Sequence, residues 1–137
     1  MGEVITTALE NASVQKEDIA AVKAHGTASA LNDTAEANGM KRVFDVLPPF
    51  FSLKPYIGHT LGGCGSVELL LMMELLLMME SVNAGFVPSC ANFAEADEEL
   101  GAVPLRKPFA VESGKFLLNY FGFGGNNTSF VIEKRSL

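Results

Sequence analysis

Both histidines of this 137-residue chain stand where a strand-like run ends and a helix-like run begins. His25 follows the apolar run 19–23, and His59 follows the second apolar run, 50–54. Short apolar runs that alternate with helix-like segments predict an α/β layer. Histidines placed at the ends of such runs point to a catalytic site.

Hydrophobic period and turn residues divide the rest of the chain. The predicted elements are the end of a helix over 3–11, a strand over 19–23, a helix from 32 to about 44, a strand over 50–54, an apolar helix over about 65–82, and paired strands over 116–120 and 129–134. Glu36, three residues after Asp33, matches a capping box, and Pro48-Pro49 stops that helix. Residues 84–114 are expected to be irregular and to wrap the surface. This order predicts one domain with a mixed sheet.

Composition narrows the class of protein. The apolar fraction of 48% and the mean hydropathy of +0.24 are high for so short a chain, so part of its apolar surface is expected to meet a partner or a missing segment. The net charge of −6, without a run of Lys or Arg, argues against nucleic-acid binding. Cys64 and Cys90 form neither a metal spacing nor a disulfide framework, and no signal peptide is visible, which favours the cytoplasm.

The run Leu69 to Met79 is apolar enough to suggest a membrane span. Glu68, Glu74 and Glu80 are spaced through this region, however, and the apolar stretch is shorter than the roughly 20 residues that a span requires. The run is therefore interpreted as a helix of the core, and no membrane span is expected.

The histidines suit catalysis because a neutral imidazole can donate one ring N–H to a developing oxyanion. A glycine beside each histidine lets the backbone approach a ligand closely. Either histidine alone is better explained as a partly buried structural residue, but two in matching contexts reverse that preference. No short ligand spacing supports a zinc site built on the pair, so no metal is expected.

Charged residues accompany the histidines. Lys54 ends a predicted strand five residues before His59 and can reach the same cleft. Glu68, near the first turns of the long helix, is a candidate ion partner for a buried ammonium group. Asp33 and Glu36 are rivals for that role, although helix capping and a solvated helix face explain them more simply.

The segment from Phe121 to Asn127 is too rich in glycine for a plain strand, and it lacks the G-x-G-x-x-G pattern of dinucleotide sites. A mobile turn that carries an exposed phenylalanine would make a gate over an acyl channel. A bulged hairpin that packs Phe121 and Phe123 into the core explains the same residues equally well. Both interpretations stay open on the sequence of this segment alone.

Three groups of residues carry a resemblance to a known family. They are His25-Gly26-Thr27 with Asn32-Asp33 and Glu36, then Ser52-x-Lys54 with Gly58-His59-Thr60-x-Gly62, then Asn119 with Phe121-Gly122-Phe123-Gly124-Gly125-x-Asn127. In this order and spacing they resemble the β-ketoacyl-acyl carrier protein synthases. The resemblance covers nearly the whole chain and matches only the C-terminal part of such an enzyme.

The resemblance implies a thiolase-like α/β fold, present here as the C-terminal half only, with residues 1–137 forming one domain of a longer chain. It implies decarboxylative Claisen condensation of malonyl-carrier protein with an acyl thioester, in fatty acid or polyketide-like biosynthesis. The implied partners are an acyl carrier protein with phosphopantetheine-linked malonyl and acyl groups, the N-terminal half of the same enzyme, and a second subunit in a homodimer or heterodimer. No redox or organic cofactor is implied.

The resemblance also implies a role for each site residue. His25 and His59 would promote malonyl decarboxylation and stabilise the enolate, while Lys54 would organise them. The remaining implied roles are an ion partner for the lysine at Glu68, phosphopantetheine contacts at Thr27 and Ser29, and a gate formed by Phe123 with Phe121 beside it, supported by Gly124 and Gly125.

The resemblance places the nucleophilic cysteine in the absent N-terminal half. Cys64 and Cys90 are interpreted as packing residues, so the isolated chain is expected to be inactive and not to be acylated. Two alternatives from other classes stay open. The parent could be a non-catalytic partner subunit of the chain-length-factor type, or the chain could be a complete small binding module. The presence of both histidines together with Lys54 favours an active condensing enzyme.

Overall fold

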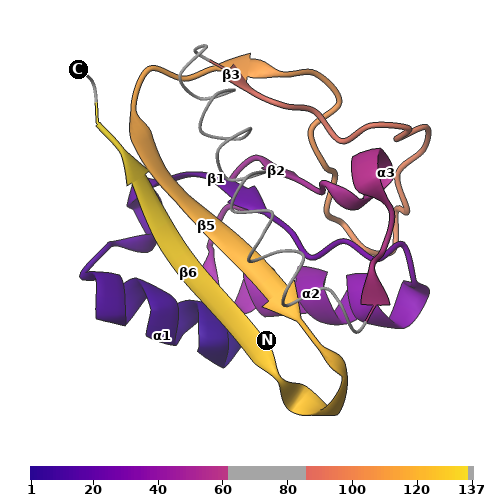
Figure 1. The fold of residues 1–137 in the computed structure, drawn as a ribbon, viewed down its shortest axis with the longest axis horizontal. Coiled ribbons are helices and arrows are strands. Elements are labelled where there is room, and N and C mark those ends of the chain that lie inside the picture. Colours follow the sequence, from indigo (N-terminus) through magenta and orange to yellow (C-terminus); the bar gives the residue numbers. More distant parts are fainter. Residues whose placement is uncertain (62–85, 136–137) are drawn as a thin grey trace.

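The structure is a computed structural model that describes residues 1–61 and 86–135 (Figure 1). Its elements in chain order are α1 (Gly2–Ala12), η1 (Lys16–Asp18), β1 (Ile19–Lys23), α2 (Ala30–Val43), β2 (Phe50–Phe51), α3 (Lys54–Ile57), β3 (Phe86–Val87), β4 (Phe109–Ala110), β5 (Gly114–Phe121), η3 (Phe123–Gly125) and β6 (Asn127–Lys134). The predicted helix over 65–82 lies outside the described residues, as do Cys64 and Glu68.

The described strands form a mixed sheet in the order β2-β1-β5-β6. β1 pairs in parallel with β2 on one side and with β5 on the other, and β5 pairs antiparallel with β6. The α/β layer with a mixed sheet, predicted from the order of the elements, is therefore confirmed. Because β1 is central, its C-terminal end, which leads to His25, is flanked by strands on both sides.

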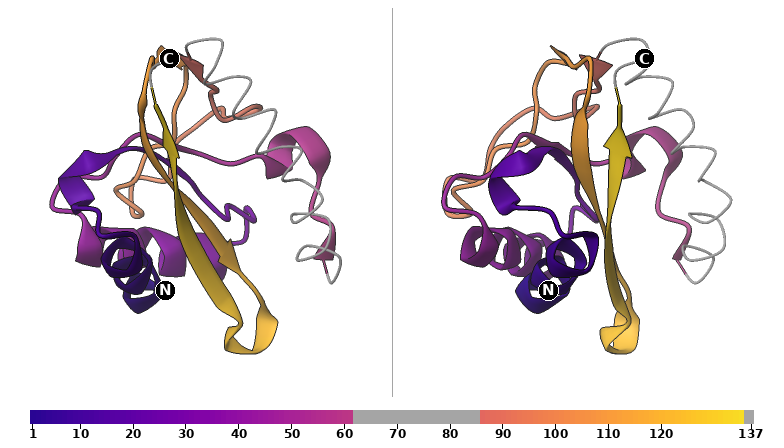
Figure 2. Two further views of the ribbon diagram at one scale, coloured as in Figure 1. Left: turned by 60° about the vertical axis from the view of Figure 1, so that its left-hand side comes forward. Right: turned by 90° about the vertical axis from the view of Figure 1, so that its left-hand side faces the viewer.

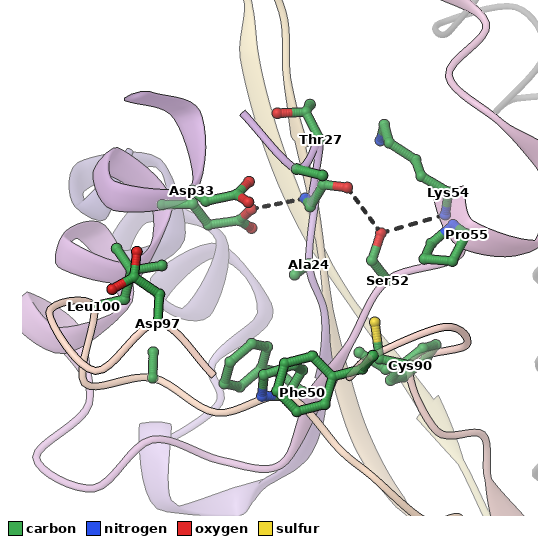
Figure 3. Close-up of a pocket in the computed structure, with 18 of the residues that line it drawn as sticks. Ala24, Thr27, Asp33, Phe50, Ser52, Lys54, Pro55, Cys90, Asp97 and Leu100 are labelled. Carbon is green, nitrogen blue, oxygen red and sulfur yellow. Dashed lines mark hydrogen bonds between the residues drawn. The ribbon is translucent and has the colours of Figure 1, made fainter. Parts of the chain in front are cut away.

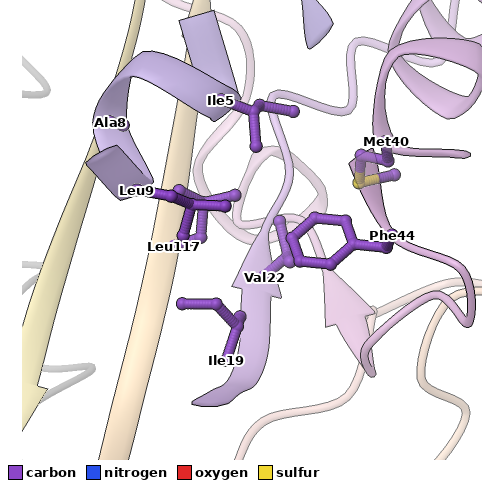
Figure 4. Packing of buried hydrophobic residues seen from close by; sticks show 8 residues of the cluster. All are labelled: Ile5, Ala8, Leu9, Ile19, Val22, Met40, Phe44 and Leu117. Carbon is purple, nitrogen blue, oxygen red and sulfur yellow. The ribbon is translucent and has the colours of Figure 1, made fainter. Parts of the chain in front are cut away.

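One face of the sheet is covered by α1 and α2, which lie side by side (Figure 2). Their buried side chains pack with strand residues of β1 and β5 in one apolar cluster (Figure 4). Its buried members are Ile5, Ala8, Leu9, Ile19, Val22, Met40, Phe44 and Leu117. Burial of such side chains, at about 25 cal/mol per Å² of apolar surface, is the main force that holds the helices to the sheet.

The opposite face of the sheet packs under the 86–111 region. The buried cluster there contains Ala21, Phe51, Val87, Val111, Phe116 and Leu118. β3 and β4 pair antiparallel above it. The prediction of an irregular, surface-wrapping segment is confirmed for most of the described part of this region, but Val87 and Val111 anchor it to the core.

Local sequence signals predicted α1, β1 and the terminal hairpin at the correct places in the chain. The predicted helix over 3–11 lies within α1, and the predicted strand over 19–23 coincides with β1. The predicted terminal pair of strands is the β5–β6 hairpin, with wider bounds than expected. Within residues 1–61 and 86–135, no helix is long and apolar enough to cross a membrane.

Two predicted boundaries were wrong. α2 begins after Ser29, whose hydroxyl accepts a hydrogen bond from the backbone N–H of Asn32 at 3.4 Å, so the N-cap is Ser29 rather than Asp33. The strand predicted over 50–54 ends at Phe51, because Pro55 favours the start of a helix and Lys54 is the first residue of α3. The lysine therefore stands at a helix start, not at a strand end.

Candidate active site

The site is built at the C-terminal end of β1, where the chain turns toward α2. Gly26 has φ +49° in this turn, and a Cβ there would lie 2.6 Å from both Cβ and Oγ of Ser52. The Ser52 hydroxyl donates to the Gly26 carbonyl at 3.2 Å and accepts the backbone N–H of Lys54 at 3.3 Å. Figure 3 shows Ser52 between this turn and Lys54. Only glycine fits this close contact with Ser52. Gly26 therefore allows the turn that carries His25 to pack against the segment that carries Lys54.

His25 is 5% exposed, and its ring has two aromatic neighbours. The centroids of the His25 and His59 rings are 5.9 Å apart in an edge-to-face arrangement. The ring of Phe121, at the end of β5, is also 5.9 Å from His25. The fold therefore brings together both histidines, which are separated by 33 residues, with one of the two phenylalanines singled out in the sequence.

Lys54 approaches His25 from α3. Its Nζ lies 3.2 Å from His25 Nδ1 and donates to the His25 carbonyl oxygen at 2.5 Å. An ammonium group has donors only, so Nδ1 must accept, and the proton of a neutral ring then resides on Nε2. Lys54 thus fixes the tautomer of His25 and leaves Nε2–H as its donor.

The Nδ1 atom of His59 also accepts a hydrogen bond, but from a different partner. The backbone N–H of Leu61 donates to His59 Nδ1 at 3.2 Å, so the neutral ring again carries its proton on Nε2. The His59 side chain is exposed, in contrast to the buried ring of His25. Each imidazole therefore keeps its Nε2 nitrogen available as a donor, on a buried ring at His25 and on an exposed ring at His59.

The pKa of His25 is lowered to about 3. Burial is the main cause, because it penalises the charged imidazolium, and the positive charge of Lys54 adds to it, followed by Lys23 and His59. His25 is accordingly neutral at physiological pH, and its ring can act as a hydrogen-bond donor rather than as a cation.

Glu36 does not lie on a solvated helix face, and it does not form a capping box, so both sequence interpretations of this residue were wrong. It is buried, and its two carboxylate oxygens accept the backbone N–H groups of His25 and Gly26, each at 2.9 Å. Burial raises the pKa of Glu36, while these hydrogen bonds, that of Asn119 and the charge of Lys23 oppose the rise. Glu36 therefore holds the backbone of the turn that carries His25, and this pair of hydrogen bonds is called the Glu36 clamp below.

Thr27 and Ser29, the predicted phosphopantetheine contacts, follow directly in the same turn. The Thr27 hydroxyl accepts a hydrogen bond from the Asn32 side-chain amide at 3.2 Å, and Thr27 lines the cavity described below. Ser29 is exposed, and its hydroxyl serves as the N-cap of α2. Ala28 between them has φ +60°, a backbone conformation that is unfavourable for a residue with a Cβ.

A cavity of about 630 Å³ opens beside this turn (Figure 3). Its lining is mixed: the polar and charged residues include Thr27, Asp33, Ser52, Lys54, His59 and Asp97, and the apolar ones include Met40, Phe50, Phe51, Phe93 and Leu100. His59 borders this cavity, and the buried His25 ring lies next to His59. Burial raises the pKa of Asp33, against backbone hydrogen bonds from residues 27 and 28 and the charge of Lys54. Cys90 also lines this cavity, and no group of three His, Cys, Asp or Glu side chains in the described ranges is placed to hold a metal ion.

The predicted gate lies at the turn between β5 and β6. Phe121 is buried and contacts the His25 ring, which agrees with a phenylalanine packed at the site. Gly124 and Gly125 have φ of +74° and +84°, and a Cβ on either would meet nothing within 4 Å. The side chain of Phe123 and the whole of Glu68 lie outside the described part of the structure.

Sequence reasoning gave no role to Lys23 and Asn119, two polar residues inside strands. Lys23 is 3% exposed, and its Nζ lies 3.7 Å from the centroid of the Tyr120 ring. Asn119 is fully buried, and its amide N–H donates to Glu36 at 3.2 Å. The signal was present, because Lys23 ends and Asn119 interrupts an otherwise apolar strand run, where a buried polar side chain needs a specific partner.

Comparison with known proteins identifies the family of the chain. Residues 1–94 match the family model described as the C-terminal domain of beta-ketoacyl synthase. The chain is 37% identical to 3-oxoacyl-[acyl-carrier-protein] synthase 2 of Vibrio cholerae, with 93% of this chain aligned to 31% of that protein. It is 36% identical to the tetracenomycin polyketide synthase ketoacyl synthase alpha subunit of Streptomyces glaucescens, with 98% of this chain aligned to 31% of that one.

Solved structures give the same result for the fold. A beta-ketoacyl synthase from Burkholderia phymatum superposes with a TM-score of 0.77 at 34% identity, over 99% of this chain and 32% of that one. A ketosynthase from Xenorhabdus doucetiae in complex with its chain length factor superposes with a TM-score of 0.76 at 29% identity, over 98% of this chain and 33% of that one. The architecture is the C-terminal part of a thiolase-like fold.

The chain belongs to the β-ketoacyl synthase C-terminal domain family, of the fatty acid and polyketide synthase type. It spans about a third of the length of the bacterial relatives and 5% of the citrinin polyketide synthase of Monascus ruber, to which it is 33% identical over 98% of this chain.

Proposed function

We propose that the chain is the C-terminal part of a β-ketoacyl-acyl carrier protein synthase that condenses malonyl-carrier protein with an acyl thioester. The observation that carries this proposal is the convergence of His25, His59 and Lys54, with Nζ 3.2 Å from His25 Nδ1 and the two imidazoles 5.9 Å apart. Nε2–H donors on two neighbouring imidazoles suit a reaction that develops negative charge on a thioester oxygen.

The reaction begins when the malonyl thioester loses its carboxylate as CO2. The electron pair of the broken C–C bond moves into the thioester, and the enolate oxygen that results carries the negative charge. His25 and His59 donate their Nε2–H groups to this oxygen, and Lys54 holds His25 in the tautomer that can donate. The enolate carbon then attacks the acyl thioester carbonyl, and the sulfur that carried the acyl group leaves as a thiolate.

The remaining groups bind the substrates in this proposal. Thr27 and Ser29 contact the phosphopantetheine arm of the carrier protein, and Phe121 with Phe123 controls access to the acyl group, on a hairpin whose Gly124 and Gly125 permit the required backbone conformations. Glu68 is the ion partner of Lys54. The thiol that carries the acyl group comes from an N-terminal half, as the family resemblance implies. Cys90, whose backbone N–H donates to the Leu105 carbonyl, is a packing residue in this proposal. The full enzyme acts as a homodimer or heterodimer.

Substitution of His59 in the full-length enzyme tests the proposal. His59 is exposed at the rim, so His59→Ala should leave folding intact while condensation falls by about 10² to 10³, the usual cost of one oxyanion donor. Thr34→Ala, at an exposed position of α2, is a matched control for a surface change. Unchanged turnover in His59→Ala would contradict the proposal.

A second candidate is a non-catalytic partner subunit that shapes the channel of an active synthase. It is kept because one similar structure is a ketosynthase in complex with a chain length factor. A partner subunit would not need Lys54 and both histidines in this arrangement, which supports the first candidate. Normal turnover of a complex that carries His59→Ala in this subunit would favour the second.

A further inference from the structure

A row of hydrogen bonds connects the β5–β6 hairpin to the turn that carries His25. The Ser129 hydroxyl on β6 donates to Oδ1 of Asn119 on β5 at 2.8 Å. The Asn119 amide N–H donates to Glu36 Oε1 at 3.2 Å, and Glu36 accepts the backbone N–H groups of His25 and Gly26. The chain of contacts thus runs from β6 through β5 and α2 to the turn that follows β1.

The orientation of the Asn119 side chain is determined by its neighbours. An ionised carboxylate can only accept, so the NH2 group of Asn119 must face Glu36, and its carbonyl oxygen must face the Ser129 hydroxyl. Asn119 is 0% exposed, and a buried amide without partners would be costly. Its amide is therefore held in one orientation from both sides.

We propose that Asn119 is a positioning residue for His25: through Glu36 it holds the backbone of the His25–Gly26 turn and ties that turn to the β5–β6 hairpin. The expected effect on turnover rests on the proposed function, whereas the structural coupling does not. The same hairpin also reaches His25 through the Phe121 ring, 5.9 Å away. A displacement of the hairpin would therefore move both the backbone and the ring environment of His25.

The Glu36 clamp requires an ionised carboxylate, because a protonated carboxyl would lose one of the sites that accept hydrogen bonds from His25, Gly26 and Asn119. Burial raises the pKa of Glu36, and the donors from Gly26, His25 and Asn119, together with the charge of Lys23, lower it. Among the described residues, Lys23 on β1 is the charged group that acts on Glu36, and Asp33 lies one turn before it on the same helix. The amide of Asn119 is one of the groups that keep the clamp ionised.

Two substitutions at position 119 in the full-length enzyme separate positioning from bulk packing. Asn119→Leu removes the donor at every pH. Asn119→Asp keeps the shape and places a second carboxyl beside Glu36, and two carboxyls this close share one proton until the pH is raised. With that proton bound, the new side chain can still donate to Glu36 and accept from Ser129, so low pH should restore the native pattern.

We expect the turnover of Asn119→Asp, divided by that of the wild type, to be highest at low pH and to fall about tenfold for each pH unit above the upper pKa of the carboxyl pair. Asn119→Leu should show no recovery at low pH. Asn38→Asp, on the exposed side of α2, is the control for the added charge and should follow the wild type. A ratio for Asn119→Asp that does not change with pH would overturn the positioning role.

A readout independent of catalysis is hydrogen exchange of the His25 and Gly26 backbone amides, which donate to Glu36. Their protection should drop by about tenfold or more in Asn119→Leu relative to the wild type, the equivalent of one hydrogen bond of about 1.4 kcal/mol. Ser129→Ala, a milder change at a half-buried position, should lower it less and serves if Asn119→Leu does not fold. Unchanged protection in both variants would refute the coupling, whereas an inactive wild type with the expected exchange would refute only the proposed function.

Discussion

Replacement of Gly26 by alanine should destabilise the chain by far more than a surface glycine substitution. Gly26 has φ +49°, and a left-handed conformation costs a residue with a Cβ about 1–2 kcal/mol. The added Cβ would also lie 2.6 Å from Cβ and Oγ of Ser52, and overpacking of this kind typically costs about 1–3 kcal/mol. We therefore expect Gly26→Ala to lower the free energy of unfolding by about 2–5 kcal/mol.

Gly124 provides the matched control. It has φ +74°, and a Cβ there would meet nothing within 4 Å, so Gly124→Ala loses only the conformational part, about 1–2 kcal/mol. The double substitution Gly26→Ala with Ser52→Gly removes the side chain that clashes and should recover part of the loss, although it also removes the hydroxyl bridge. Chemical denaturation of the full-length protein measures all of these differences.

The reasoning fails if Gly26→Ala costs no more than Gly124→Ala, because the close approach to Ser52 would then contribute nothing. Because the turn positions His25 and the Ser52 segment leads to Lys54, the same substitution should also lower turnover if the proposed function is correct. Normal turnover in a folded Gly26→Ala variant would show that the contact between the two segments is not needed to align the site.

Three further predictions follow from the core and from the charges around His25. Leu117→Ala in the buried cluster should cost about 2–5 kcal/mol in denaturant unfolding, whereas Val46→Ala, at a side chain that is 85% exposed, should change stability by less than about 0.5 kcal/mol; similar losses would contradict the assignment of the core. Lys54→Met should raise the pKa of His25 in an NMR titration, because the lysine charge lowers it; an unchanged value would refute the contact. The pKa of His25 is about 3 when folded and about 6.5 when unfolded, so the stability contributed by the neutral ring is present above about pH 6.5 and is lost as the pH falls toward 3. The slope of unfolding free energy against pH should accordingly be shallower in His25→Gln, and equal slopes would argue against a buried neutral ring.

The sequence predicted those elements whose signals are local. α1, β1 and the β5–β6 hairpin follow from apolar periodicity and turn residues within a few positions, and they lie where predicted. The functional motifs were also local, since each histidine is flanked by a glycine. Their convergence required the parallel pairing of β1 with β2, which brings residues near 25 and near 52 together.

Glu36 shows where sequence reasoning failed and why. Its spacing from Asp33 satisfies the pattern of a capping box, yet its partners are backbone groups 10 and 11 residues earlier and an amide 83 residues later. No local pattern records such distant contacts. The error at Lys54 has a different cause. Pro55 is a local signal of a helix start, but the apolar run before Lys54 favoured a strand up to residue 54.

The most direct test of the site is a measurement of the ring nitrogens of His25 and His59 by ¹⁵N NMR in the full-length protein, with each signal assigned by its loss in His25→Gln and His59→Gln. Because Lys54 and the Leu61 amide donate to the two Nδ1 atoms, we expect Nε2 to carry the proton of both neutral rings, and we expect His25 to stay neutral down to about pH 5. A proton on Nδ1 of His25, or a charged His25 at neutral pH, would contradict the proposal that the two imidazoles act together as hydrogen-bond donors.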